Sequence, residues 1–100
     1  MLNISKEANE GTLKIGLEGR LDTVTAPQLE DALKDSTDSV KELVFDLEKL
    51  EYISSAGLRV LLSMQKIMNK QGSMKIRGAN ENIMEIFEVT GFVDILTIEK

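Results

Sequence analysis

Residues 43–71 read LVFDLEKLEYISSAGLRVLLSMQKIMNKQ, and this stretch decides the fold. The apolar run at residues 43–47 is typical of a strand buried on both faces of an open sheet, and it predicts the central strand. From Ala56 to about Gln71, apolar side chains recur at helical spacing and predict a long amphipathic helix. They are Val60, Leu61, Met64, Ile67 and Met68. A buried strand that leads into such a helix predicts a βαβ unit and a parallel sheet.

The N-terminal part of the chain predicts a hairpin and a first helix. Residues 12–19 alternate apolar with polar side chains, which is typical of a strand with one covered face. A weaker strand is expected around residues 2–4, with residues 7–11 as the hairpin loop. A helix is expected to begin at Thr25, with Gln28 at capping-box spacing, and to run to about Ser36.

The C-terminal part predicts the remaining elements. Gly72 is expected to end the long helix in a left-handed conformation, and residues 73–77 then read as a short strand. A third helix is expected from Asn80 to about Thr90, with Gly91 as its stop and residues 95–98 as a last strand. The sequence therefore predicts one α/β domain over residues 1–100, with helices packed on a mixed, mainly parallel β-sheet.

The composition excludes several classes of protein. The net charge of −5 makes a nucleic acid a poor partner, because its phosphates would be repelled. Neither cysteine nor histidine is present, so the chain cannot build a thiol nucleophile, a histidine-ligated metal site or a Ser-His-Asp triad. The first residues have no apolar core of a secretion signal, and no apolar run has the length of about 20 residues that a membrane span needs. A cytoplasmic protein without a membrane anchor is expected.

Two serines and a glycine lie where the central strand region leads into the long helix, in the sequence Ser54-Ser55-Ala56-Gly57. A phosphoryl group on either serine would lie at the positive end of the helix dipole, where free backbone amides bind anions. The same residues also fit a plain helix cap with a packing glycine. A nucleophilic serine is disfavoured, because the first glycine of a nucleophile elbow and an activating histidine are both missing. The chain is therefore not expected to be an enzyme.

Several motifs together resemble one known family. They are GRLDTVTA at residues 19–26, LVFDL at 43–47, YISSAGL at 52–58 and FEVTGF at 87–92. In order and spacing they are similar to the STAS domain of anti-sigma factor antagonists, over essentially the full chain. The resemblance implies a STAS-like mixed sheet with flanking helices and a protein-binding switch that needs no metal or cofactor.

The resemblance also implies site residues and partners. By motif position Ser55 would be the phosphorylated serine, with Ser54 as the alternative, because many members have an aspartate at that position. The implied partners are an anti-sigma factor that is also a serine kinase, and a PP2C-type serine phosphatase. The expected partner-binding residues are Asp22, Thr23, Thr25, Ser54, Ala56, Gly57 and Leu58. Asp22, Thr23 and Thr25 fit equally well a turn followed by a helix cap.

The mechanism implied by the resemblance is release of a sigma factor. The unmodified protein would bind the anti-sigma kinase, and phosphorylation of Ser55 would end that binding. One alternative is a STAS module that is never phosphorylated and acts as a scaffold in a larger signalling assembly, although the bare length of the chain argues against it. A nucleotide-binding protein is a further alternative that rests only on the anion-binding start of the long helix.

Overall fold

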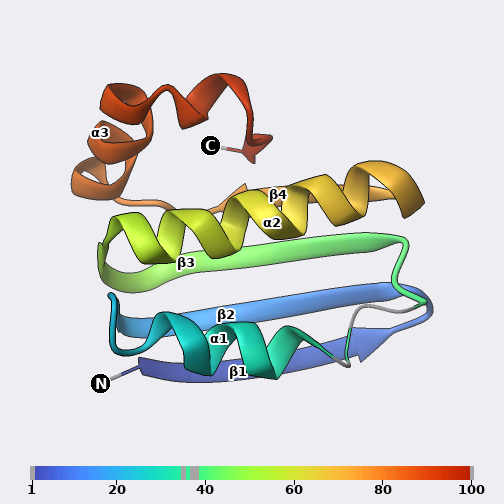
Figure 1. Ribbon diagram of the computed structural model, residues 1–100. Coiled ribbons are helices and arrows are strands. Elements are labelled where there is room, and N and C mark those ends of the chain that lie inside the picture. The colour runs from blue at the N-terminus through green and yellow to red at the C-terminus, as the bar shows by residue number, and fades with distance from the viewer. Residues whose placement is uncertain (1, 35, 37–38, 100) are drawn as a thin grey trace.

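The computed structural model describes residues 2–34, 36 and 39–99. These residues contain one five-stranded sheet with the strands in sequence order (Figure 1). The strands are β1 Leu2–Asn9, β2 Thr12–Leu21, β3 Glu42–Ile53, β4 Ser73–Arg77 and β5 Ile98–Glu99. The helices are α1 Ala26–Lys34, α2 Ser55–Gln71, α3 Glu81–Thr90 and the short 3₁₀ helix η1 Phe92–Asp94. Because β1 pairs antiparallel with β2 and the other pairs are parallel, the predicted mixed, mainly parallel sheet is confirmed.

The core lies between the sheet and the helices. Helices α1 and α2 lie side by side over one face of the sheet, where α2 contacts β3 and β4 (Figure 1). Leu43, Phe45 and Leu47 of the central strand are fully buried, as alternation along a strand with one covered face requires. The opposite face is only partly covered: Val44 is buried there, but Asp46 forms an ion pair with Lys14 at 3.8 Å. The prediction of burial on both faces is therefore right at Val44 and wrong at Asp46.

The N-terminal hairpin is longer and tighter than predicted. Strand β1 continues through the expected loop to Asn9, with Glu7 paired to Lys14. The turn consists of Glu10 and Gly11, which both have positive φ values (46° and 86°), and two such residues match the twist of a two-residue hairpin. The polar stretch over residues 7–9 looked like a loop because β1 is an edge strand, whose residues there are exposed.

The first helix begins directly after Thr25 as predicted, but its capping and its end differ from the prediction. It ends at Lys34 rather than at about Ser36, and Asp35, which falls within the predicted range, lies outside the described residues. The predicted capping box is wrong, because the Gln28 side chain donates its hydrogen bond to the carbonyl of Leu2 instead. Gln28 thereby ties α1 to the edge strand β1.

Helices α2 and α3 confirm most of the sequence pattern. Ile67, expected in the apolar stripe of α2, is 42% exposed, because it lies at the edge of the stripe that the sheet does not cover. Helix α3 ends as predicted at Gly91, which has a left-handed φ of 80°. The last strand was predicted too early: η1 intervenes, and β5 consists of Ile98 and Glu99.

Candidate functional site

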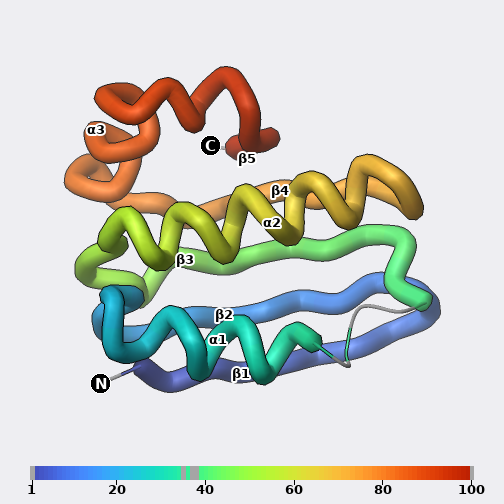
Figure 2. The backbone as a smooth tube through the Cα atoms, viewed as in Figure 1, coloured from blue at the N-terminus to red at the C-terminus, as the bar shows by residue number. Residues whose placement is uncertain are grey.

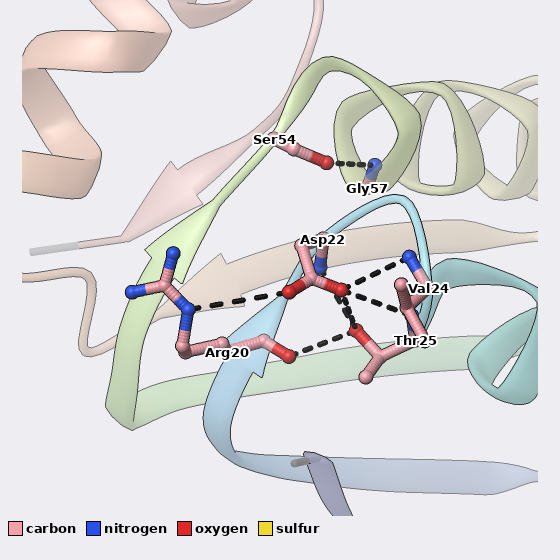
Figure 3. A network of polar contacts seen from close by, with 6 residues as sticks. All are labelled: Arg20, Asp22, Val24, Thr25, Ser54 and Gly57. Atoms are coloured by element: carbon pink, nitrogen blue, oxygen red, sulfur yellow. Dashed lines mark hydrogen bonds and ion pairs between the residues drawn. The ribbon is translucent and has the colours of Figure 1, made fainter.

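The candidate site is formed where β2 and β3 end side by side. Leu21 pairs with Ile53 in parallel, and the Ser54 amide donates to the Leu21 carbonyl at 2.9 Å. The loop that follows β2 therefore lies next to the start of α2, as Figure 3 shows. The carboxyl ends of parallel strands are the usual place for a binding site in an open α/β sheet.

The two serines have different roles in the backbone. Ser54 is the N-cap of α2: it is half-buried, has extended backbone angles, and its hydroxyl accepts a hydrogen bond from the Gly57 amide at 3.4 Å. Ser55 is the first residue of the helix and is exposed. The cap predicted from the sequence is therefore confirmed and belongs to Ser54, while Ser55 is accessible from solvent.

Asp22 organises the neighbouring loop through its carboxylate (Figure 3). Oδ1 accepts hydrogen bonds from the amides of Val24 and Thr25, both at 3.0 Å. The bond from the Thr25 amide is the largest cause that lowers the pKa of the Asp22 carboxyl, and partial burial acts in the opposite direction. The Arg20 guanidinium adds to the lowering, with Nε at 4.0 Å from Oδ2. Asp22 is therefore a fixed negative charge beside the start of α2.

The two threonines of the loop differ in exposure. Thr25 is buried, and its hydroxyl lies 2.8 Å from both the Asp22 amide, from which it accepts, and the Arg20 carbonyl, to which it donates. Thr23 is exposed. Thr25 therefore holds the shape of the loop, whereas Thr23 offers a polar side chain to a partner.

The three residues after Ser55 shape the start of α2. Ala56 is half-buried, and Gly57 and Leu58 are buried. A Cβ atom on Gly57 would lie 2.7 Å from Leu21 Cγ and 2.9 Å from Ile53 Cγ1. The glycine therefore lets α2 approach the side chains at the ends of β2 and β3, which is the role of a packing glycine.

Three exposed residues of this surface were missed at the sequence level. Val24, beside Thr23, is 84% exposed. The guanidinium of Arg20 lies over the ring of Tyr52, 4.4 Å from its centroid, so a cation–π pair borders the Asp22 loop. The sequence pattern did not identify this pair, because Tyr52 lies five residues after the end of the strand predicted at residues 43–47. No group of three or more acidic residues in the described ranges is placed to hold a metal ion.

The lowered pKa of Asp22 predicts a pH-dependent contribution to stability. Because the folded pKa lies below the unfolded value of about 3.9, the contribution is complete above that pH and is lost as the pH falls through the folded pKa. Asp22→Asn should therefore lower the urea midpoint at neutral pH, and the gap from wild type should shrink in acid. Asp31→Asn, an exposed carboxylate on α1, is the matched control. A gap that stays constant down to about pH 2.5 would show that the charge of Asp22 is not the cause.

Known proteins are similar to this chain in sequence and in fold. The family model described as the STAS domain matches residues 3–100. The anti-sigma-B factor antagonist of Bacillus subtilis is 30% identical over 97% of this chain and 90% of its own length. The crystal structure of an anti-sigma factor antagonist from Mycobacterium paratuberculosis has a TM-score of 0.89 at 25% identity, and covers 98% of this chain and 85% of that one.

The chain belongs to the STAS domain family. The Bacillus cell fate determinant SpoIIAA in its phosphorylated form shares the fold, with a TM-score of 0.76 at 17% identity over 98% of this chain and 92% of that one. In the described part of the chain, no helix has the length and apolar character needed to cross a membrane.

Proposed function

We propose that this protein is an anti-sigma factor antagonist that acts as a single 100-residue STAS domain in the bacterial cytoplasm. It binds an anti-sigma factor that is also a serine kinase, and so releases a sigma factor for transcription. Phosphorylation of Ser55 by that kinase ends the binding, and a PP2C-type phosphatase restores it. The observation that carries the proposal is the exposed Ser55 on the first turn of α2, beside the loop that Asp22 fixes.

The choice of Ser55 over Ser54 rests on their different environments. The Ser54 hydroxyl is half-buried and occupied as the cap of α2, so a kinase would have to break its hydrogen bond with the Gly57 amide to reach it. The Ser55 side chain is exposed, so a kinase can reach its oxygen without disturbing the helix start. The proposed phosphate would also lie at the positive end of the α2 dipole, which favours negative charge.

The contact surface of the proposed complex surrounds Ser55. Asp22 and Thr23 from the β2–α1 loop, with Ser54 and Ala56 from the start of α2, supply its partly or fully exposed members. Val24 adds an apolar contact, because burying a valine that is 84% exposed contributes favourable free energy on binding. Thr25, Gly57 and Leu58 support this surface from below. The protein acts by binding, without a cofactor and without catalysis of its own.

Two comparisons support the proposal. The Bacillus subtilis relative named anti-sigma-B factor antagonist aligns with nearly the whole chain. SpoIIAA matches this fold in its unphosphorylated and its phosphorylated form, each with a TM-score of 0.76, which supports a switch that works without refolding. We infer that phosphate controls binding by its charge at the surface.

Intact-mass spectrometry with site mapping tests the proposed modification. The protein is incubated with ATP and the candidate anti-sigma kinases of its source, as wild type and as Ser55→Ala. One added phosphate that maps to Ser55 and is absent from the variant is the expected result. Ser63→Ala, an exposed serine further along α2, is the matched control and should still gain the phosphate. Phosphate on Ser54 would keep the proposed function but assign the modification to Ser54. If no candidate kinase adds a phosphate, the alternative function, a STAS scaffold that is never phosphorylated, would be favoured.

A further inference from the structure

The C-terminal part of the chain has an unusual charge distribution. Residues 78–99 contain five carboxylates and no lysine or arginine, a balance equal to the net charge of the whole chain. The carboxylates are Glu81, Glu85, Glu88, Asp94 and Glu99, and all of them are exposed. Glu99 on β5 forms an ion pair with Lys75 at 3.6 Å, and the other four lie on α3 and η1, so this part of the surface carries a negative field.

The same region exposes apolar side chains. Val89 is 80% exposed, and Val93 and Ile95 in and after η1 are 39% and 50% exposed. A shallow hollow of about 250 Å³ lies along one face of α3. Its lining consists of Asn82, Glu85, Ile86, Val89 and Thr90. Of the exposed apolar residues only Val89 lines this hollow, together with the half-buried Ile86, while Val93 and Ile95 lie outside its lining. An exposed valine beside a hollow on a helix with a second apolar side chain indicates a binding surface.

Helix α3 packs against the core with one face only, and its other face is exposed. Ile83 and Phe87, on the opposite side of the helix, are fully buried and hold α3 in place. The Asn80 side chain caps α3 by accepting from the Ile83 amide, and donates to the Leu50 carbonyl of β3 at 3.0 Å. Because α3 is fixed in this way, its outer face stays open for a partner.

We propose that α3 and η1 form a docking surface, here called the α3 surface, for a basic amphipathic segment of a partner protein. Ile86 and Val89 contact the apolar side of that segment, while Glu85 and Glu88 face its lysines and arginines. Charge complementarity selects this occupant, because a second copy of the chain would bring the same carboxylates together. Nucleic acids and anionic membranes are repelled for the same reason.

The position of the α3 surface suits a partner with two contacts. The hydrogen bond from Asn80 to Leu50 attaches the start of α3 to the end of β3, shortly before Ser54. Figure 2 shows α3 and the first turn of α2 at the same end of the molecule. A single partner can therefore bind the Ser55 region and the α3 surface together, although the α3 surface itself does not depend on phosphorylation.

Nuclear magnetic resonance titration tests this surface directly. The probe is a synthetic helix of about 14 residues with leucines on one face and lysines on the other. We expect its addition to shift the amide signals of residues 82–95 and to leave those of α1 and β1 unchanged. Val89→Ser should weaken the binding about tenfold, since it removes the main apolar contact. Replacing Glu85 and Glu88 with glutamine should reduce the dependence of binding on salt.

Matched variants keep this test specific. Ile67→Ser removes an exposed apolar side chain from α2, outside both surfaces, and should change the affinity less than twofold, within about 0.4 kcal/mol. A probe with glutamate in place of lysine should not bind. Shifts spread over all acidic parts of the protein, or equal weakening by Ile67→Ser, would overturn the proposal. Self-association of the free protein that Val89→Ser abolishes would do the same. Because the test uses no kinase, it is separate from the test of Ser55.

Discussion

Phosphoserine at position 55 is expected to weaken binding to the anti-sigma partner by about 100-fold or more and to leave the fold intact. A phosphoserine adds roughly 1.5 to 2 negative charges at pH 7. One unfavourable unit-charge pair at 4 Å costs about 4 kcal/mol at an effective dielectric of 20, and about 1.4 kcal/mol is a tenfold change in affinity. For about 1.5 added charges the cost is about 6 kcal/mol, and with half of it screened about 3 kcal/mol remains, which is a loss of about 100-fold.

Phosphorylation of Ser55 should slightly raise the stability of the folded protein, although it weakens binding. Ser55 is the first residue of α2, and negative charge at a helix N-terminus stabilises by about 0.3–1 kcal/mol. Genetic incorporation of phosphoserine separates the two effects, with calorimetry for binding and thermal unfolding for stability. An equal loss of affinity with phosphoserine at Ser63, about two turns further along α2, would show that the effect is not specific to Ser55. If the protein with phosphoserine at position 55 is unfolded, the loss of binding is caused by a change in structure and not by charge repulsion.

Gly72→Ala should destabilise the protein by about 3 kcal/mol, the largest effect expected from any alanine substitution of a glycine in this chain. A Cβ atom at position 72 would lie 1.9 Å from the Lys41 carbonyl oxygen, which is a backbone atom and cannot rotate away. That carbonyl also accepts a hydrogen bond from the Ser73 amide at 2.8 Å, where β4 begins beside β3. Relief of the clash would therefore separate the starts of two paired strands.

Gly16→Ala provides the comparison for this experiment. Its Cβ atom would lie 2.5 Å from Ser5 Oγ, the end of an exposed side chain that can rotate away by giving up a long hydrogen bond to the Gly16 carbonyl at 3.5 Å. We expect a change of less than about 1 kcal/mol in the free energy of unfolding, measured in urea for both variants. Equal effects of the two substitutions would mean that the Lys41 backbone moves easily, and would contradict the argument for Gly72.

Much of the site was predictable because it depends on local sequence and on strand order. The cap at Ser54 and the start of α2 follow from side-chain type and helical periodicity. Parallel pairing of β2 with β3 brings the Asp22 loop to Ser54, as the alternation of strands and helices predicted. The pairing of Arg20 with Tyr52 was not predictable, because it depends on irregularities in register between Gly16 and Glu18 and between Gly19 and Arg20.

The sequence by itself determined the number and order of most elements, since hydrophobic periodicity and caps act between near neighbours. It also placed Ser54 and Ser55 at the start of the strongest helix. Tertiary structure decided which of these features became accessible. Val24 and Val89 are exposed although both are apolar, and Thr25 is buried although it is polar, because the packing of distant segments sets exposure.

At Gly72, local sequence and tertiary structure each determine a different property. Its position after the last apolar residue of α2 predicted a left-handed cap, but its φ is 175°, an extended value. The glycine is required because Lys41, thirty-one positions earlier in the chain, places its carbonyl oxygen where a Cβ atom would lie. A local pattern identifies where a helix ends, and only the packed chain determines which residues can occupy that end, because steric exclusion acts between atoms that are close in space.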